Sequence, residues 1–234
     1  MTGTENPRVG GSIPPPGHFM SASRVGRRVL LRPPRAADQA GFLALVKASR
    51  AFHRPWMRPP GTPAAFRDYV GWSRKETLRR MMLVRREDGA ILGVFNLSQI
   101  FFGDFRSAYL GYWVGAPFAG QGYMTEGMEL LLRYAFRTLK LHRVEANVQP
   151  GNAESIALVR RTGFRREGFS PRYLKVAGRW RDHERWAMTV EDFRSSRRDP
   201  GTARRRSPLA SPGRPAPPSR KPQRRRPSPR RSRS

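Results

Sequence analysis

Four residues, Ala119-Gly120-Gln121-Gly122, have the composition of a loop that binds phosphate. Two of the four are glycines, so no side chain shields their backbone N–H groups. Apolar residues at helical spacing begin directly after the loop, and the unpaired N–H groups and positive dipole end of such a helix point back at it. This arrangement attracts phosphate oxygens, whereas the alternative is an ordinary turn between a strand and a helix.

The elements that must position this loop are marked in the sequence. Residues 107–114 have the pattern of a half-buried strand, which Gly115 and Pro117 end. The helix after the loop is predicted from one apolar face, made of Met124, Met128, Leu131, Leu132, Ala135 and Leu139.

A second strand and helix follow in the same order. Residues 142–148 alternate, and Glu145 belongs to the polar face of that strand. Asn152 is predicted to cap a helix over 153–161, and Gly163 suits its end.

Upstream, the pattern predicts a strand, two helices and an antiparallel meander. In chain order these are strand 28–32, a helix from 36 or 37 to about 50, a helix from Pro63 to about 79, and strands 81–86 and 91–100 around an Asp88-Gly89 turn. Downstream, strands are expected at 173–176 and 184–189 around an Ala177-Gly178 turn.

The composition restricts the possible chemistry. None of the 234 residues is cysteine, which excludes disulfides, thiolate zinc sites and a cysteine nucleophile. No apolar run reaches membrane-spanning length, and residues 1–26 are too rich in Gly, Pro and Ser to fold or to act as a signal peptide. We therefore expect a cytoplasmic protein without membrane contact, with one folded domain at residues 27–193.

The net charge of +29 indicates an anionic partner, such as nucleic acid, a ribonucleoprotein or a phosphorylated cofactor. About half of it comes from residues 194–234, which hold 14 Arg, 1 Lys and 1 Asp. We expect this tail to be disordered. Its Arg triplets at 204–206 and 224–226 suit non-specific RNA or ribosome contact, and the alternative is a solubilising extension.

Five blocks of sequence, taken together, resemble one family. They are LGYWVG at 110–115, GQGYMTE at 120–126, LHRVEANVQPGNAES at 141–155, TGFRREGF at 162–169 and GRWRDH at 178–183. In this order they resemble the GCN5-related N-acetyltransferase (GNAT) superfamily, and most closely its ribosomal-protein-alanine N-acetyltransferase (RimJ/RimL-like) type. The resemblance implies an α+β fold: a twisted, mixed, mostly antiparallel sheet, helices on both faces, and a V-shaped split between the fourth and fifth strands.

The resemblance also implies acetyl-CoA as co-substrate, bound in that split. A backbone N–H near Val114 would hold the thioester carbonyl, and N–H groups of residues 119–125 would hold the pyrophosphate. The cofactor contacts that it carries over are Trp113, Val114, Ala119, Gly120, Gln121, Gly122, Tyr123, Met124, Thr125 and Asn152. Ala119 and Met124 depart from the family pattern, which has Gln or Arg at the first position and a small residue at the second. Backbone donors do not depend on either side chain.

Acetyl transfer to an amine requires a neutral amine, a stabilised oxyanion and a proton for the departing thiolate. Without cysteine, direct attack by the amine is the economical route, and no metal is implied. The resemblance places the Ser155 hydroxyl near the sulfur or near a bridging water. Val159 stands where many members carry a tyrosine acid, which adds weight to Ser155 and to Tyr173 as catalytic residues.

The sequence leaves several candidates for the general base. Glu145, on the strand lining the split, is the candidate base through a water molecule, and its alternative role is a salt bridge with Arg143 or Arg165. Asp182 and His183 are further candidates, although such a pair is more often structural.

The acceptor that the resemblance implies is the N-terminal α-amine of a protein, in particular a ribosomal protein. A small-molecule amine acetyltransferase is an alternative, although the basic body disfavours polycationic acceptors. A second alternative is an RNA- or ribosome-binding protein with a vestigial acetyltransferase body, which Ala119 and Met124 favour. Trp56 and Phe102 are predicted either to line the acceptor channel or to pack in the core. The sequence does not distinguish monomer from dimer.

Overall fold

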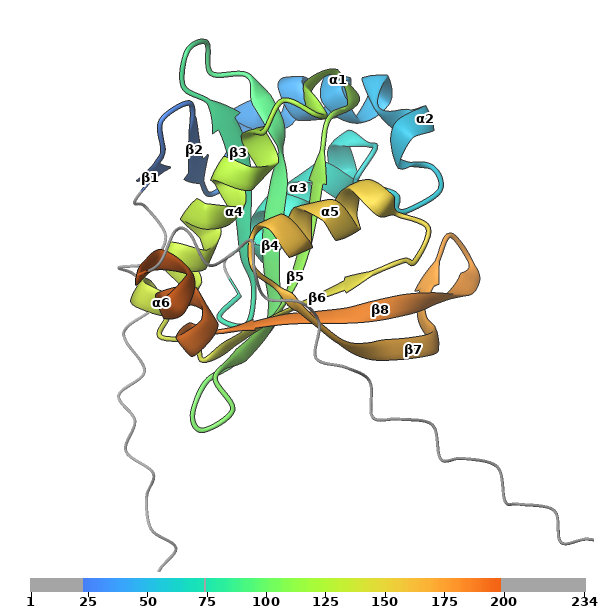
Figure 1. Cartoon of the computed structure of the whole chain (residues 1–234). Helices are drawn as coiled ribbons and strands as arrows, with labels where there is room; N and C mark the ends of the chain where they lie inside the picture. Colours follow the sequence, from blue (N-terminus) through green and yellow to red (C-terminus); the bar gives the residue numbers. More distant parts are fainter. Residues whose placement is uncertain (1–22, 74, 199–234) are drawn as a thin grey trace, which may run out of the picture. The chain divides into compact units, whose positions relative to one another are not determined.

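The computed structural model describes residues 23–73 and 75–198, which build one sheet with helices on both of its faces (Figure 1). The strand order is β1-β2-β3-β4-β5-β6-β8-β7. In chain order the strands are β1 (Arg24–Val25), β2 (Val29–Arg32), β3 (Arg79–Arg85), β4 (Ile91–Phe101), β5 (Ser107–Val114), β6 (Arg143–Val148), β7 (Arg165–Val176) and β8 (Arg179–Thr189). Only β5 and β6 pair in parallel; the other neighbours are antiparallel. The predicted α+β class with a mixed, mostly antiparallel sheet is confirmed.

The helices occupy both faces of this sheet. They are α1 (Gln39–Ala48), α2 (Arg50–His53), α3 (Pro63–Trp72), α4 (Tyr123–Arg133), α5 (Ala153–Arg161) and α6 (Val190–Arg198), with short turns η2 (Ala36–Asp38), η3 (Ala116–Phe118) and the π-helical η4 (Tyr134–Thr138). In Figure 1, α4 and α5 lie in front of the sheet and α3 lies behind it.

Two hydrophobic clusters correspond to the two faces. Val94 of β4 packs in a cluster with Phe42 and Phe66, whereas its neighbour Phe95 packs in a cluster with Leu131. Successive side chains of a strand point to opposite faces, so one strand serves both clusters. Each fully buried side chain of this size contributes about 1.5–3 kcal/mol. β5 also contributes residues to both clusters, so it is packed on both of its faces.

The second predicted helix is shorter than expected. It begins at Pro63 with Thr62 as its N-cap, but it ends at Trp72 rather than near residue 79. The Tyr69 carbonyl accepts hydrogen bonds from the Ser73 hydroxyl (2.9 Å) and from the Arg80 guanidinium (2.6 Å). Such side-chain donors compete with the backbone bond that would continue the helix. The sequence that follows joins the sheet as β3.

The N-terminal edge of the sheet also differs from expectation. Arg24–Val25 forms the short strand β1, where no strand was expected, and it pairs with β2. The split still lies between the two strands predicted to border it, which count as the fifth and sixth of the chain because β1 precedes them. The predictions for residues 1–22 and 199–234, including the Arg triplets, lie outside the described residues.

Within the described ranges, no helix combines the length and apolar character that crossing a bilayer requires.

Candidate active site

A split in the sheet opens between β5 and β6. The two strands pair only from Ser107 opposite Arg143 to Tyr109 opposite Glu145, and they diverge beyond that point. A cavity of 940 Å³ lies beside the end of β5, beyond the paired part, and is lined by residues of β5, the glycine loop, α4, α5, the segment around α2 and residues 26–28. The predicted V-shaped split is present, with the glycine loop on its wall.

The end of β5 presents main-chain groups to this split. The Gly115 N–H donates to the Leu92 carbonyl of β4 (2.7 Å). Backbone groups alternate between the two sides of a strand, so the N–H and C=O of Val114 point away from β4, toward the split. Because β6 has already diverged, it does not pair with Val114. The predicted donor position at Val114 therefore agrees with the strand register.

The glycine loop holds unpaired backbone donors. Gly120 and Gly122 have φ of 74° and 79°, conformations that side-chain-bearing residues rarely adopt. Among the described residues, no hydrogen bond uses the N–H groups of residues 120–124. The N–H of Ala119 donates to Ala116 (3.3 Å), and that of Thr125 donates to Gly122 (3.1 Å). The expected donor set of residues 119–125 therefore narrows to 120–124.

Two side chains of the predicted cofactor set turn away from the cavity. The Gln121 amide donates to the Pro117 carbonyl (2.8 Å), and the Tyr123 ring lies under the Arg28 guanidinium, 4.7 Å from the ring centroid. Neither residue lines the cavity. The other members of the set that line it are Trp113, Val114, Ala119, Gly120, Gly122, Met124, Thr125 and Asn152.

Arginines from distant parts of the chain supply positive charge beside the loop. The cavity is lined by Arg27, Arg28, Arg133 and Arg161, together with Glu126, Glu129 and Glu154, which leaves a small excess of positive charge. Arg28 donates to the Gln121 carbonyl (3.2 Å) and pairs with Glu126, and Arg161 donates to the Thr125 hydroxyl (3.2 Å). These arginines provide charged donors beside the loop, where Ala119 replaces the Gln or Arg of the family pattern. Sequence reasoning missed them, because no local pattern connects them to the loop.

Ser155 lies on the cavity wall beside a tyrosine. The Asn152 side chain accepts from the Ser155 N–H (3.1 Å), which confirms the predicted N-cap of α5. The Ser155 hydroxyl hydrogen-bonds the Tyr112 hydroxyl (2.6 Å). Burial raises the pKa of Tyr112 to about 12, so this phenol keeps its proton at neutral pH. The pair is a neutral, proton-carrying group at the split.

Sequence reasoning missed Tyr112. The alternation of side chains along β5 could have indicated it, because it places Tyr112 on the same face as Leu110. That face is covered by α4 and α5. A hydroxyl on a buried face needs a partner, and the first turn of α5 supplies one in Ser155.

Glu145 and Tyr173 are not among the cavity-lining residues. Glu145 accepts from Arg143 (2.8 Å) and Arg185 (2.7 Å). Burial opposes ionisation, but these bonds hold the pKa of Glu145 below its ordinary value. The salt bridge with Arg143 is therefore present, which weakens the case for Glu145 as a base. The other expected partner, Arg165, pairs with Asp192 instead.

The remaining candidates have structural contacts. The Tyr173 hydroxyl accepts from the Asn147 amide (3.3 Å), and burial raises the pKa of Tyr173. Asp182 accepts from the backbone of Arg172, and His183 is buried against the Arg181 carbonyl. None of these three residues lines the cavity.

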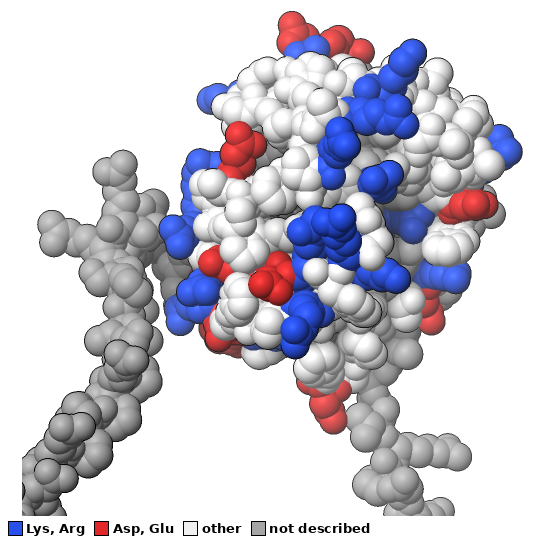
Figure 2. All heavy atoms as spheres, turned by 90° about the vertical axis from the view of Figure 1, so that its right-hand side faces the viewer, with Lys and Arg blue, Asp and Glu red and all other residues white. Residues whose placement is uncertain are grey.

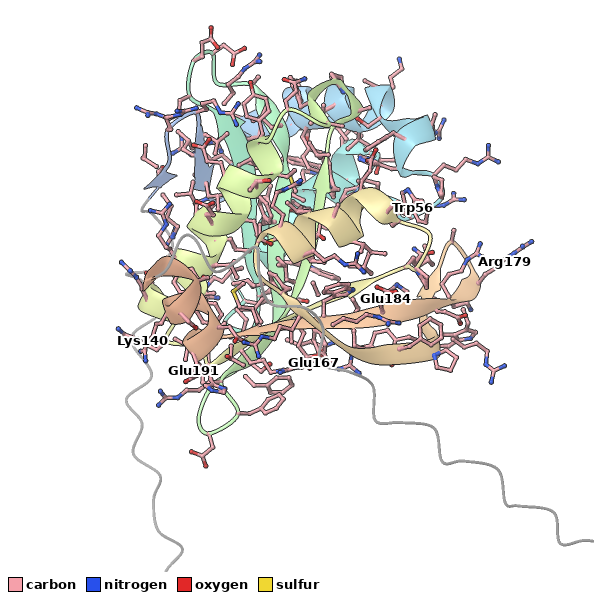
Figure 3. All side chains as sticks on the ribbon, in the orientation of Figure 1. Trp56, Lys140, Glu167, Arg179, Glu184 and Glu191 are labelled. Carbon is pink, nitrogen blue, oxygen red and sulfur yellow. The ribbon has the colours of Figure 1, made fainter. Side chains whose placement is uncertain are left out.

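The two aromatic residues predicted to line the acceptor channel or to pack in the core lie in different places. Trp56 lines the cavity, and Figure 3 shows it near the start of α5, where the Gln149 amide donates to its carbonyl (3.1 Å). Phe102 packs against the core.

Replacing Glu145 by Gln should lower the free energy of unfolding at pH 7 by about 1.5–3 kcal/mol, because two charge-assisted hydrogen bonds weaken. A carboxyl whose pKa lies below its unfolded value of about 4.3 stabilises the fold fully above that pH, and the contribution is lost as pH falls through the folded-state pKa. Urea unfolding curves of variant and wild type should therefore differ at neutral pH and converge in acid.

The exposed Glu87 gives the matched control, since Glu87→Gln should leave stability unchanged. A large fall in turnover for Glu145→Gln at unchanged stability would contradict the structural role and restore Glu145 as the base.

Within the described residues, no group of three or more His, Cys, Asp or Glu side chains is placed to hold a metal ion.

Comparison with known proteins identifies the family. The family model of the acetyltransferase (GNAT) domain matches residues 28–165, more than half of the chain. The chain belongs to this family of acetyltransferases. The ribosomal protein uS5-alanine N-acetyltransferase of Escherichia coli (strain K12) is 40% identical over 111 residues, covering 47% of this chain and 57% of that enzyme. The chain thus matches little more than half the length of this relative.

Two further relatives are matched over more of their length. Probable N-acetyltransferase YjcK of Bacillus subtilis (strain 168) is 29% identical over 175 residues, covering 71% of this chain and 97% of that protein. The solved structure of Mycobacterium smegmatis RimJ in complex with CoA-disulfide has a TM-score of 0.68 and 30% identity, covering 75% of this chain and 90% of that one. The chain is therefore related to ribosomal-protein acetyltransferases.

Proposed function

We propose that this protein transfers the acetyl group of acetyl-CoA to the N-terminal α-amine of a protein, with a ribosomal protein as the acceptor. The observation that carries the acetyl-CoA part is the cavity beside the end of β5, which is lined by four arginines and by Gly120, Gly122 and Met124, whose N–H groups are unpaired among the described residues. Such a cradle fits a diphosphate, because backbone donors and fixed positive charges both favour anionic oxygen.

Bound acetyl-CoA supplies an activated acyl thioester. The N–H groups of Gly120, Gly122 and Met124, with Arg28 and Arg161 beside them, would hold its phosphates, and the Val114 N–H is the donor for a carbonyl oxygen. The Ser155 hydroxyl, backed by Tyr112, carries the proton that a leaving thiolate needs. Asn152 fixes the first turn of α5 and so fixes Ser155.

Two observations support a protein acceptor. The Escherichia coli relative is named for the alanine of ribosomal protein uS5. The surface also suits an anionic ribonucleoprotein surface, since Lys and Arg cover more of the face in Figure 2 than Asp and Glu do. The same charge disfavours a polycationic small molecule as acceptor. The unpaired donors of the loop argue against a vestigial body.

Calorimetric titration should show saturable binding of acetyl-CoA to the purified chain. Mass spectrometry should then show one or more ribosomal proteins whose N-termini are acetylated in cells with this protein and free in cells without it. Re-expression of the Ser155→Ala variant is the control, because it should bind acetyl-CoA and fail to restore acetylation. No saturable binding would overturn the acetyl-CoA role; unchanged ribosomal N-termini with intact binding would overturn the acceptor alone.

A further inference from the structure

Three residues of the first helical segment, α1 with α2, contact the end of β5. Leu45, Ser49 and His53 are spaced four apart, so they follow one another along one side of a helix. All three are buried, with exposed fractions of 8%, 0% and 4%. Their contacts fall on the three consecutive residues that leave the strand.

Each contact fixes a different part of that turn. The Ser49 hydroxyl accepts from the Ala116 N–H (2.9 Å), and His53 Nε2 bonds the Val114 carbonyl (2.8 Å). Between them, Gly115 has no room for a side chain, because a Cβ there would lie 2.2 Å from Leu45 Cδ1. One helix side therefore controls both the hydrogen bonding and the position of this turn.

The His53 ring has a defined tautomer. A carbonyl only accepts hydrogen bonds, so Nε2 carries the proton in the bond to Val114. Burial lowers the pKa of His53, which keeps the ring neutral at pH 7. Its Nδ1 is buried and has no hydrogen-bond partner among the described residues. The ring packs edge-on against Trp113, with centroids 5.1 Å apart.

His53 occupies the side of Val114 that a continuous sheet would give to β6. Val114 turns both its N–H and its C=O toward the split, and the helix donor engages the C=O. The N–H of Val114 then remains available, on the side that faces the split, to donate a hydrogen bond to a ligand. A thioester carbonyl needs a donor there, and an adjacent unpaired acceptor would repel it.

We propose that Leu45, Ser49 and His53 form a positioning element that aims the Val114 N–H at the acyl carbonyl. This inference rests on the proposed use of acetyl-CoA. It assigns no covalent step to these residues, which act through the backbone of residues 114–116.

A pair of serine variants separates positioning from folding. Ser49 and Ser73 are both buried helix C-caps, with exposed fractions of 0% and 4%, and each hydroxyl bonds one backbone group. Ser49→Ala and Ser73→Ala should lower the melting temperature to a similar extent. Only Ser49→Ala should also lower kcat, by about 10-fold, with little change in the KM for acetyl-CoA. The expected loss is smaller than the ~10²–10³-fold loss in kcat that follows removal of such a donor, because the Val114 N–H is displaced and not removed.

His53 offers a test by conservative rescue. A Gln side chain can still donate to the Val114 carbonyl, whereas Leu cannot, so His53→Gln should keep more of kcat than His53→Leu. The exposed His142 provides the control, and His142→Gln should behave as wild type.

A readout without turnover comes from amide hydrogen exchange of the ligand-free protein. The Ala116 N–H should exchange faster in Ser49→Ala than in wild type, and at the wild-type rate in Ser73→Ala. Equal exchange and equal kcat in the two serine variants would overturn the positioning role. If the wild type neither binds nor uses acetyl-CoA, the proposed function fails, while exchange at Ala116 still reports whether the helix fixes the strand end.

Discussion

Replacing Ser155 by alanine is expected to lower kcat for amine acetylation by roughly 10²-fold or more, with little loss of acetyl-CoA affinity. The hydroxyl lies on the cavity wall and hydrogen-bonds Tyr112 at 2.6 Å, so α5 presents it to the cavity as a neutral proton donor. Alanine removes the proton donor while the Asn152 cap, which bonds the Ser155 backbone, remains. Steady-state kinetics together with calorimetric binding of acetyl-CoA separate the two quantities.

The matched control is Ser195→Ala, a helical serine of α6 whose hydroxyl bonds only its own helix. Tyr112→Phe keeps the packed ring and removes the phenol proton, and it should cost about 10-fold in kcat. If the two hydroxyls act as one unit, the double variant should be no slower than Ser155→Ala. Wild-type kcat in Ser155→Ala would remove this residue from the mechanism.

Replacing Gly122 by valine is expected to weaken acetyl-CoA binding by roughly 10–100-fold, equivalent to about 1.4–2.8 kcal/mol. Gly122 has φ of 79°, and a β-branched residue is strained there by about 1–3 kcal/mol. Relief of that strain would rotate the peptide groups of the loop, so its N–H groups would no longer point toward one site. Calorimetric titration with acetyl-CoA measures the change in Kd directly.

Gly89 in the β3–β4 turn provides the control, because its φ of 75° is nearly the same and it does not line the cavity. Gly89→Val should cost similar stability and leave the Kd for acetyl-CoA unchanged. Equal Kd values for Gly122→Val and wild type would show that the loop does not hold the cofactor.

The sequence predicted those parts of the fold whose signals are local. β5 and α5 have the expected bounds, because a strand broken by Gly115 and Pro117 and a helix capped by Asn152 are encoded within a few residues. The glycine loop was found for the same reason. The set of residues with unpaired N–H groups is smaller than predicted, 120–124 and not 119–125, because the N–H groups of Ala119 and Thr125 form turn hydrogen bonds.

Long-range contacts account for what the sequence did not show. The early end of α3 depends on Arg80, which lies eleven residues beyond the carbonyl it engages. β7 starts at Arg165 rather than 173, because it is an edge strand whose mostly exposed residues show no apolar alternation. The Tyr112–Ser155 bond and the Arg185–Glu145 pair join elements that only the tertiary fold brings together.

The divergence of β5 and β6 has a consequence for solubility. Unpaired strand edges usually recruit strands of other molecules, which is why exposed edges promote aggregation. Here the two unpaired edges lie inside the sheet, and residues of α4 and α5 form part of the wall in front of them. The protein thereby keeps main-chain groups available to a narrow ligand while denying them to the strands of a neighbouring chain.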